Sequence, residues 1–352
     1  MEQDKKHLLE MIDRPAFLVR EGIIVYCNQT AKNRQVREGM PVAELIPEEC
    51  DAYGNYRGGV LYMTLMLGWI PCGATVTRQE DTDVFLLDRD YDQTHLQVLA
   101  LAAQQLRTPL SNAMTVMDEL VPALNADQQT QGAQLSRALF QLLRQISNMA
   151  DAERYVGGEG ATMEKTELRS FFREIFEKAD VSLSETDVSV QYTGPENQVF
   201  SMVERERMER AVYNLLSNAV KFSPKGSCVQ ATLTRAGKLM RLTIEDQGDG
   251  IASHVQGSLY HRYLREPAIE DSRFGLGLGM ALVRSVAALH GGTVLIDQTK
   301  GTRVTMTFAG RTTLPGTLRS PVMRIGDYAG GRDLGLLEFS ESLPLNAYKN
   351  DN

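Results

Sequence analysis

Hydrophobic residues between about residues 10 and 90 come in short runs that polar turns separate. The runs AFLVREGIIVYCN, GGVLYMTLMLGW and DVFLLDRD contain stretches of strand length, so they predict a small mixed α/β domain over residues 1–90. The REG turn predicts a tight hairpin in which Gly22 adopts positive φ. The longest apolar run, Val60 to Pro71, is shorter than a membrane span and contains Gly68, so we expect a buried core segment there.

A different period begins near residue 93, where hydrophobic residues recur in steps of three and four. The first stripe comprises Leu96, Leu99, Ala103, Leu106, Leu110, Ala113, Met117, Leu120 and Leu124. After the NADQQ turn, the second comprises Leu135, Leu139, Leu142, Ile146 and Met149. Such stripes predict a helical hairpin over residues 91–158. Two amphipathic helices cannot bury both seams alone, so we expect a dimer with a four-helix bundle; the alternative is a hairpin packed on a neighbouring domain of its own chain.

From about residue 165 to 310, helices alternate with strands. The strand segments are VSVQYTG, CVQATLTRAG, LMRLTIED, GTVLIDQT and TRVTMTF. They predict an α/β sandwich, with helices on one face of a mixed sheet, over residues 159–310. The glycine-rich residues 156–161 are suited to a flexible joint before it, and residues 311–352 form a Gly- and Pro-rich tail to which the sequence assigns no role. The expected fold class is therefore α+β with several domains.

Composition and charge narrow the function classes. The 352 residues include 43% hydrophobic and 23% charged residues, which are globular values. The net charge is −8 and no long basic block occurs, so we expect no direct nucleic-acid binding. Cys27, Cys50, Cys72 and Cys228 form no close pair. Because no signal-peptide core or membrane anchor is visible either, we expect a cytoplasmic protein.

Four separated motifs in the third region carry chemistry. The helix RAVYNLLSNAVKFSP places Asn214 and Asn218 one turn apart on the same face, with Lys221 on the neighbouring turn. In DQGDGI, Asp246 ends a strand and is followed by a sharp turn containing Gly248 and Gly250. Taken alone, the paired asparagines are equally typical of amides that face solvent, and DQGDGI is equally typical of a simple turn.

The other two motifs complete the order. FGLGLGMAL places Gly275, Gly277 and Gly279 just before an apolar helix, where backbone amides can cradle phosphates. GTRVTMTF then returns a strand with Thr302 at its start. All four motifs in this order leave little room for chance.

This order resembles the N, G1, G2 and G3 boxes of the GHKL superfamily, which contains histidine kinases, DNA gyrase, MutL and Hsp90-type chaperones. The resemblance covers about residues 165–310, and the spelling NLLSNAVKFS is that of histidine kinases. It implies binding of ATP and Mg²⁺. By this resemblance, Asp246 accepts a hydrogen bond from adenine, with Thr302 supporting it through water. Asn218 binds Mg²⁺, and Asn214 and Lys221 contact phosphates.

The resemblance also implies a mobile lid over residues 253–274, with Gly277, Leu278 and Gly279 as its hinge. Phe222, Ile251 and Met280 flank these motifs and are counted with the nucleotide site. The hydrolysing members of the superfamily have a Glu where this chain has Asn214. An amide cannot take a proton from water, so transfer to a protein group, or binding alone, is favoured over hydrolysis.

The helical region departs from its family. QQLRTPL, at residues 104–110, resembles the phosphoacceptor motif H-E-L-R-T-P-L of the dimerisation helices. Gln104 replaces the nucleophilic histidine and Gln105 replaces the neighbouring carboxylate, and carboxamides can do the work of neither. Thr108 remains, and the resemblance implies a role in removing phosphate from a response regulator, although a Thr before Pro is also good helix chemistry. PAFLVREGIIVYCNQTA, in the first domain, resembles the start of a PAS domain, in which a hairpin ends in an Asn before a short helix.

The remaining histidines offer no persuasive acceptor. His95 lies on the opposite helix face from Gln104, His290 is expected to cap a helix, and the others, His7, His254 and His261, lie outside the bundle. We therefore expect a two-component signalling protein that binds Mg·ATP and acts on a partner histidine kinase or a response regulator, as a homodimer or heterodimer. Phosphatase activity and purely conformational use of ATP stay open. The alternative is a pseudokinase scaffold with a relic ATP site. A serine kinase of the anti-sigma-factor type is disfavoured by the attached helices.

Overall fold

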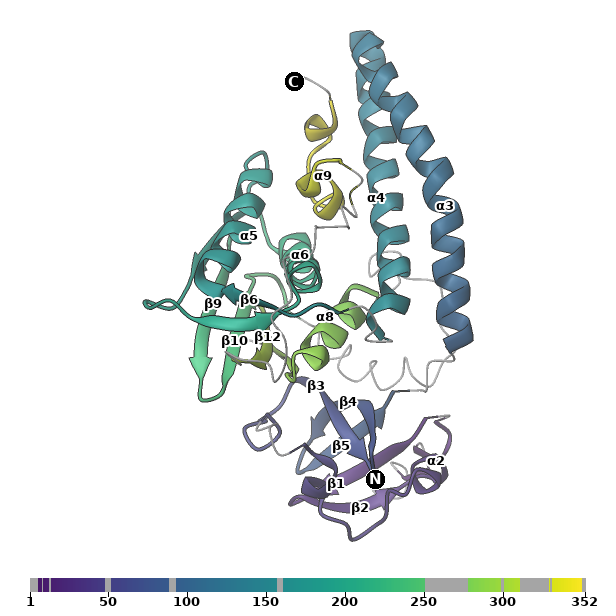
Figure 1. Ribbon diagram of the computed structural model, residues 1–352, viewed down its shortest axis with the longest axis vertical. Coiled ribbons are helices and arrows are strands. Elements are labelled where there is room, and N and C mark those ends of the chain that lie inside the picture. The colour runs from purple at the N-terminus through teal and green to yellow at the C-terminus, as the bar shows by residue number, and fades with distance from the viewer. Residues whose placement is uncertain are drawn as a thin grey trace.

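The computed structural model describes most of the chain. The described residues are 6–7, 9–12, 14–47, 52–88, 93–156, 161–250, 278–298, 301–310, 329 and 331–349, with the backbone alone for 93–99, 126–127, 152–156, 278 and 298. In these ranges, no helix combines the length and the apolar character needed to cross a membrane. Figure 1 shows a sheet-rich N-terminal part, a long helical hairpin, and a second sheet with its helices.

The N-terminal part is an antiparallel five-stranded sheet in the order β2-β1-β5-β4-β3. Its strands are β1 Ala16–Arg20, β2 Ile23–Cys27, β3 Val60–Leu67, β4 Ile70–Gln79 and β5 Thr82–Leu87, with the short helices α2 Gln29–Asn33 and η1 Val42–Leu45. The predicted hairpin is confirmed: β1 pairs with β2, and Gly22 has φ 77°. Asn28 ends this hairpin and caps α2, because its buried side chain accepts a hydrogen bond from the backbone of Ala31 at 3.0 Å.

The expectation of a buried segment from Val60 to Pro71 is wrong at its C-terminal end. Strand β3 is mainly buried, but Trp69 is 96% exposed and Ile70 is 69% exposed. The two residues lie at the turn between β3 and β4, where the hairpin extends beyond the core that covers its strands. A run of apolar letters cannot reveal where a hairpin leaves the core.

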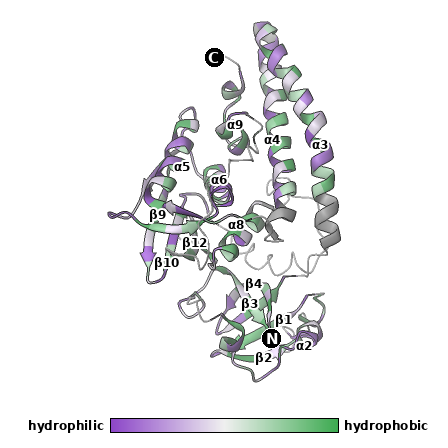
Figure 2. Cartoon of the chain, viewed as in Figure 1, coloured by the Kyte–Doolittle hydropathy of each residue, from purple (hydrophilic) through white to green (hydrophobic). Residues whose placement is uncertain are grey.

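The predicted helical hairpin is present as α3 Gln93–Leu120 and α4 Ala126–Val156, joined through the 3₁₀ turn η2 Val121–Ala123. The two helices pack side by side (Figure 1). Hydrophobic and hydrophilic residues alternate along both of them (Figure 2). Part of each stripe is buried, including Ala103, Leu110, Met117 and Ile146. Another part is about half exposed: Leu106, Leu120, Leu135 and Leu142.

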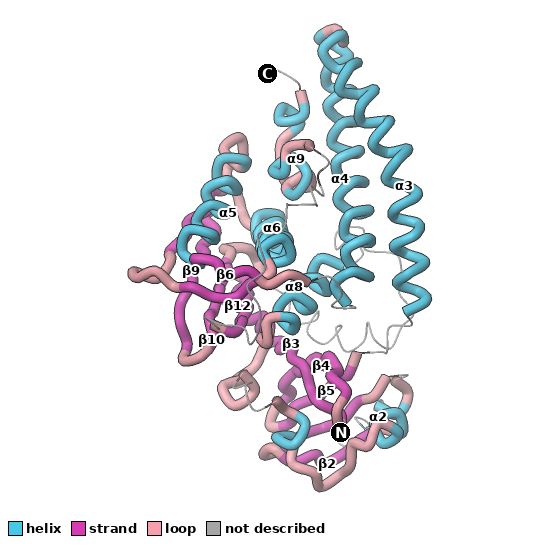
Figure 3. Tube along the Cα trace, viewed as in Figure 1, coloured by secondary structure: helices cyan, strands magenta, loops and turns pink. Residues whose placement is uncertain are grey.

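The second sheet has the order β11-β12-β10-β9-β7, in which β7 runs parallel to β9. Its strands are β7 Ser189–Thr193, β9 Cys228–Ala236, β10 Leu239–Glu245, β11 Val294–Gln298 and β12 Thr302–Ala309. The separate pair is β6 Glu164–Glu167 and β8 Phe200–Val203, and the helices are α5 Leu168–Ser182, α6 Arg205–Phe222 and α8 Leu278–Leu289. Figure 3 shows α6 and α8 between this mixed sheet and α4, which agrees with the predicted α/β sandwich.

The two sheets are continuous, a connection that no pattern in the sequence predicts. Edge strand β3 pairs antiparallel with edge strand β11, aligning Tyr62 with Val294, and a ten-stranded sheet results. Beside this junction, Arg284 of α8 donates to Asp88 over 2.6 Å, and its guanidinium lies 4.2 Å from the centre of the Tyr62 ring. The N-terminal part is therefore attached directly to α8, the helix that begins within the third motif, FGLGLGMAL.

The C-terminal tail is also folded in part. It contains α9 Leu334–Glu338 and the 3₁₀ turn η4 Leu345–Tyr348, and these lie between α4 and the pair α5 and α6 (Figure 1). Its large buried hydrophobic side chains are Leu337, Phe339, Leu343 and Tyr348. The segment is too short to show a period, so its hydrophobic residues gave no helical signal.

Candidate functional site

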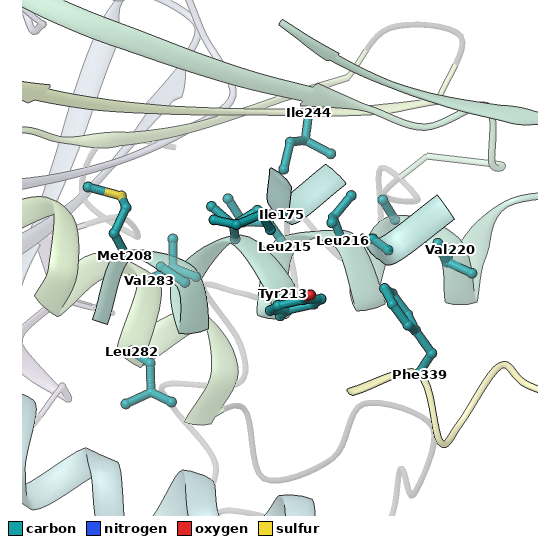
Figure 4. Close-up of a cluster of buried hydrophobic side chains, with 14 of the residues drawn as sticks. Ile175, Met208, Tyr213, Leu215, Leu216, Val220, Ile244, Leu282, Val283 and Phe339 are labelled. Carbon is teal, nitrogen blue, oxygen red and sulfur yellow. The ribbon is translucent and has the colours of Figure 1, made fainter. Parts of the chain in front are cut away.

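Helix α6 carries the paired asparagines. Its N-terminus is capped by Glu204, whose carboxylate accepts from the backbone of Arg207 at 2.6 Å. Its apolar face is fixed in the core, as Figure 4 shows for side chains from α5, α6, α8 and β10. Asn214 is buried and donates through Nδ2 to the Arg210 carbonyl at 2.9 Å, whereas Asn218, one turn later, is exposed. The helix thus presents one fixed and one accessible amide on the predicted face.

Asp246 lies at the end of β10 and is nearly buried. Its Oδ1 accepts from the backbone N–H groups of Gly248 and Thr302, each at 2.9 Å. The direct backbone contact with Thr302 joins the second and fourth motifs without water. Among the described residues, the hydrogen bonds to this carboxylate end on Oδ1, so Oδ2 is the oxygen available to a ligand amino group. Gly250 has φ 70°, as the predicted sharp turn requires.

The third motif meets the first at Gly279, near the start of α8. A Cβ on Gly279 would lie 2.5 Å from Asn214 Oδ1, so any other residue here would displace the Asn214 side chain. Met280 is half-buried beside it. Of the other predicted residues, Ile251, Gly275, Gly277 and the lid segment 253–274 lie outside the described residues, and Leu278 is described by its backbone alone.

Lys221 and Phe222 end α6. Phe222 is 47% exposed, and the Lys221 ammonium lies 5.7 Å from the centre of its ring. Lys221 Nζ also forms an ion pair with Glu341 of the C-terminal tail at 2.6 Å. Sequence reasoning missed Glu341, because a lone glutamate in a segment without periodicity carries no local signal.

The second candidate site lies on α3, where Gln104, Gln105 and Thr108 are all exposed. Pro109 is inside the same helix, so its ring removes one backbone hydrogen bond directly after Thr108. His95 belongs to α3, but its side chain is outside the described residues. Residues 104–110 of this helix therefore offer accessible carboxamides and contain no histidine.

His290 is a helix cap, as predicted. Its Nδ1 lies 2.7 Å from the Val286 carbonyl, and its Nε2 accepts from the backbone of Glu204 at 3.0 Å. Burial lowers the pKa of this imidazole. His7 is exposed outside the hairpin, and His254 and His261 lie outside the described residues.

Comparison with known proteins gives the region a family. Residues 203–312, which contain all four motifs, match the model for the histidine kinase-, DNA gyrase B- and HSP90-like ATPases. The chain carries a histidine-kinase-like ATPase domain. The match supports ATP binding by this domain. It does not extend to the helical hairpin or to the N-terminal sheet.

Curated relatives extend the likeness. The sensor-like histidine kinase SenX3 of Mycobacterium tuberculosis is 28% identical over 216 residues, which are 60% of this chain and 52% of the relative. The heme sensor protein HssS of Staphylococcus saprophyticus is 28% identical over 220 residues, 58% of this chain and 45% of the relative. Together with the ATPase domain, these relatives support a sensor histidine kinase family. The chain spans about half the length of the curated relatives it matches.

Among solved structures, full-length ShkA in complex with AMPPNP has a TM-score of 0.48 and 22% identity. The likeness covers 63% of this chain and 47% of that chain. At this level, the comparison does not place any residue of the site.

Proposed function

We propose that this chain is a two-component signalling protein that binds Mg·ATP in its histidine-kinase-like ATPase domain but does not phosphorylate itself at residue 104. It acts instead on a partner histidine kinase or on a response regulator. The single observation that carries the proposal is the combination of a histidine-kinase-like ATPase domain with an exposed glutamine at position 104.

The adenine end of the site is assigned to Asp246. Two backbone N–H groups hold Oδ1 of this nearly buried carboxylate, which orients Oδ2 toward a ligand. A carboxylate fixed in this way is a strong acceptor for an adenine amino group. The connection to Thr302 ties its position to β12, so the sheet itself sets the geometry.

The phosphate end is assigned to α6. Asn214, Asn218 and Lys221 lie on successive turns, and the exposed amide oxygen of Asn218 is a suitable single protein ligand for Mg²⁺. Mg²⁺ usually keeps several waters and takes its other ligands from nucleotide phosphates, so a site with few carboxylates fits it. The bound ion would offset phosphate charge, while Lys221 and Asn214 orient the triphosphate.

The acceptor end points to action on other proteins. Attack on the γ-phosphate needs a ring nitrogen of neutral histidine, and the amide nitrogen of Gln104 has no basic lone pair to supply. The exposed leucines of the hairpin, Leu106 and Leu120 on α3 with Leu135 and Leu142 on α4, favour a second hairpin beside this one. A partner hairpin would complete a four-helix bundle in which a histidine of the partner could receive phosphate. Thr108 beside Gln104 equally suits dephosphorylation of a response regulator.

A pseudokinase scaffold is the second candidate, because the same carboxamides at residues 104 and 105 suit a purely structural role. Titration calorimetry with Mg·ATP separates the two. We expect binding by the wild-type chain and a loss of about 10- to 150-fold in Asp246→Asn, because one charge-assisted hydrogen bond contributes about 1.5–3 kcal/mol. Asp249→Asn is the matched control, since Asp249 is exposed in the same turn. Absence of binding by the wild-type chain would favour the scaffold, and equal affinity in the two variants would refute the role of Asp246.

A further inference from the structure

The folded end of the tail, residues 331–349, is here called the strap. It spans the ATPase domain and the hairpin: Phe339 packs edge-on against Tyr213 of α6 with ring centres 6.0 Å apart, and Tyr348 contacts Phe140 of α4 at 5.5 Å. Figure 4 shows Phe339 reaching toward Tyr213. A Cβ on Gly335 would lie 2.1 Å from Ser182 Oγ of α5. The strap is therefore packed closely against several elements.

A buried ion network joins the strap to both partners. Glu338 is fully buried and pairs with Arg210, a fully buried residue of α6, and with Arg144 of α4 at 3.2 Å. Arg210 also binds Asp151 of α4 at 2.9 Å. Because buried charges are tolerated only when they are paired, this network fixes the register of the strap against α6.

The network brings Glu341 to Lys221. The Arg137 side chain of α4 donates to the backbone carbonyls of Ser340 and Glu341, each at 3.0 Å, so the chain is held on both sides of the glutamate side chain. Glu341 Oε2 lies 2.6 Å from Lys221 Nζ. Both side chains are about one-quarter to one-third exposed, at 24% for Lys221 and 32% for Glu341. The Glu341 carboxylate thus occupies the Lys221 ammonium group, which lies at the end of α6 that we assign to the phosphates.

We propose that the strap is an intrachain competitor of the nucleotide, in which the Glu341 carboxylate takes the place of a phosphate on Lys221. This inference rests on the proposed function, because it requires ATP to bind along α6. Binding of the triphosphate would separate the Lys221–Glu341 pair, and that cost would weaken the affinity for ATP. Any event that moves the strap away from α6 would then raise the affinity for ATP. The strap therefore sets the ATP concentration at which the protein binds nucleotide.

The test compares Glu341→Gln with the wild-type chain by titration calorimetry with Mg·ATP and with adenosine. A partly exposed ion pair of this kind contributes modestly, so we expect ATP to bind roughly 1.5- to fivefold more tightly to the variant. Adenosine has no phosphate, so its affinity should not change. The matched control is Glu185→Gln, an exposed glutamate in the turn after α5, which removes the same charge and should leave both affinities unchanged. In a Lys221→Gln background, Glu341→Gln should bring no further gain.

The outcomes separate the inference from the proposed function. Equal or weaker ATP binding by Glu341→Gln, or an equal gain for ATP and adenosine, would overturn the competition. A gain that persists without Lys221 would overturn it as well. Absence of ATP binding in wild type and all variants would instead refute the proposed function, and the inference with it.

Discussion

The ion network under the strap allows a direct test of the forces that hold the ATPase domain to the hairpin. Replacing Glu338 by Gln keeps the size of the side chain but removes the charge that two arginines share. Breaking a buried ion pair costs about 3–5 kcal/mol. Arg210 retains Asp151 at 2.9 Å and Arg144 retains Glu341 at 3.8 Å. Because of these partners, we expect a smaller loss, about 2–3 kcal/mol of unfolding free energy.

The matched control is Asp118→Asn, which breaks an exposed ion pair between the strap and the hairpin. Asp118 lies 2.7 Å from Arg332 but is 53% exposed, so its loss should cost less than about 1 kcal/mol. Urea unfolding followed by far-UV circular dichroism, with slopes compared between variants, gives both values. Equal losses in the two variants would refute the reasoning, since it holds that burial, rather than the distance between the charges, decides the cost.

Three further predictions concern the nucleotide site, the buried His290 and the exposed face of the hairpin. Gly279→Ala should weaken ATP binding in titration calorimetry, because the added Cβ would lie 2.5 Å from Asn214 Oδ1 and so displace the Asn214 amide; unchanged affinity would contradict the assignment of these two residues. Because burial lowers the pKa of His290, the folded chain keeps it neutral, so its contribution to stability is present above about pH 6.5 and lost as the pH falls below that value. As the pH falls from 8 to 5, the melting temperature of the wild-type chain should therefore drop more than that of His290→Gln. Equal drops in the two proteins would disprove this prediction. Leu106→Glu combined with Leu120→Glu should convert a dimer into monomers in light scattering, and a monomeric wild-type chain would rule out the bundle.

Local motifs made the ATPase region predictable. The letters around Asn214, Asp246 and Thr302 indicate a helix face, a strand end and a strand start, and the structure has each of them there. The resemblance to the GHKL superfamily also led us to expect that Asp246 and Thr302 act together, and a hydrogen bond of 2.9 Å joins them. The helical hairpin could be predicted equally well. Hydrophobic residues recur in steps of three and four on both sides of a polar turn, which is typical of two amphipathic helices. His290 was predictable as a cap from its position before two glycines.

The remaining features depend on contacts between distant segments. Strand β3 joins β11 through backbone hydrogen bonds, and backbone pairing leaves no side-chain signature by which an edge strand can be recognised. Glu338 and Arg210 are 128 positions apart in the chain, and neither residue type predicts burial. The exposed Trp69 reflects the same limit, since the position of a turn relative to the core is decided by packing.

The central claim is that this chain binds ATP yet lacks a phosphoacceptor on its own hairpin. The most direct measurement is incubation of the purified chain with Mg²⁺ and γ-labelled ATP, alongside the variant Gln104→His with Gln105→Glu. We predict no label on the wild-type chain and acid-labile, base-stable label on the double variant. Stable label of that kind on the wild-type chain would contradict the account and make His95 the first residue to replace.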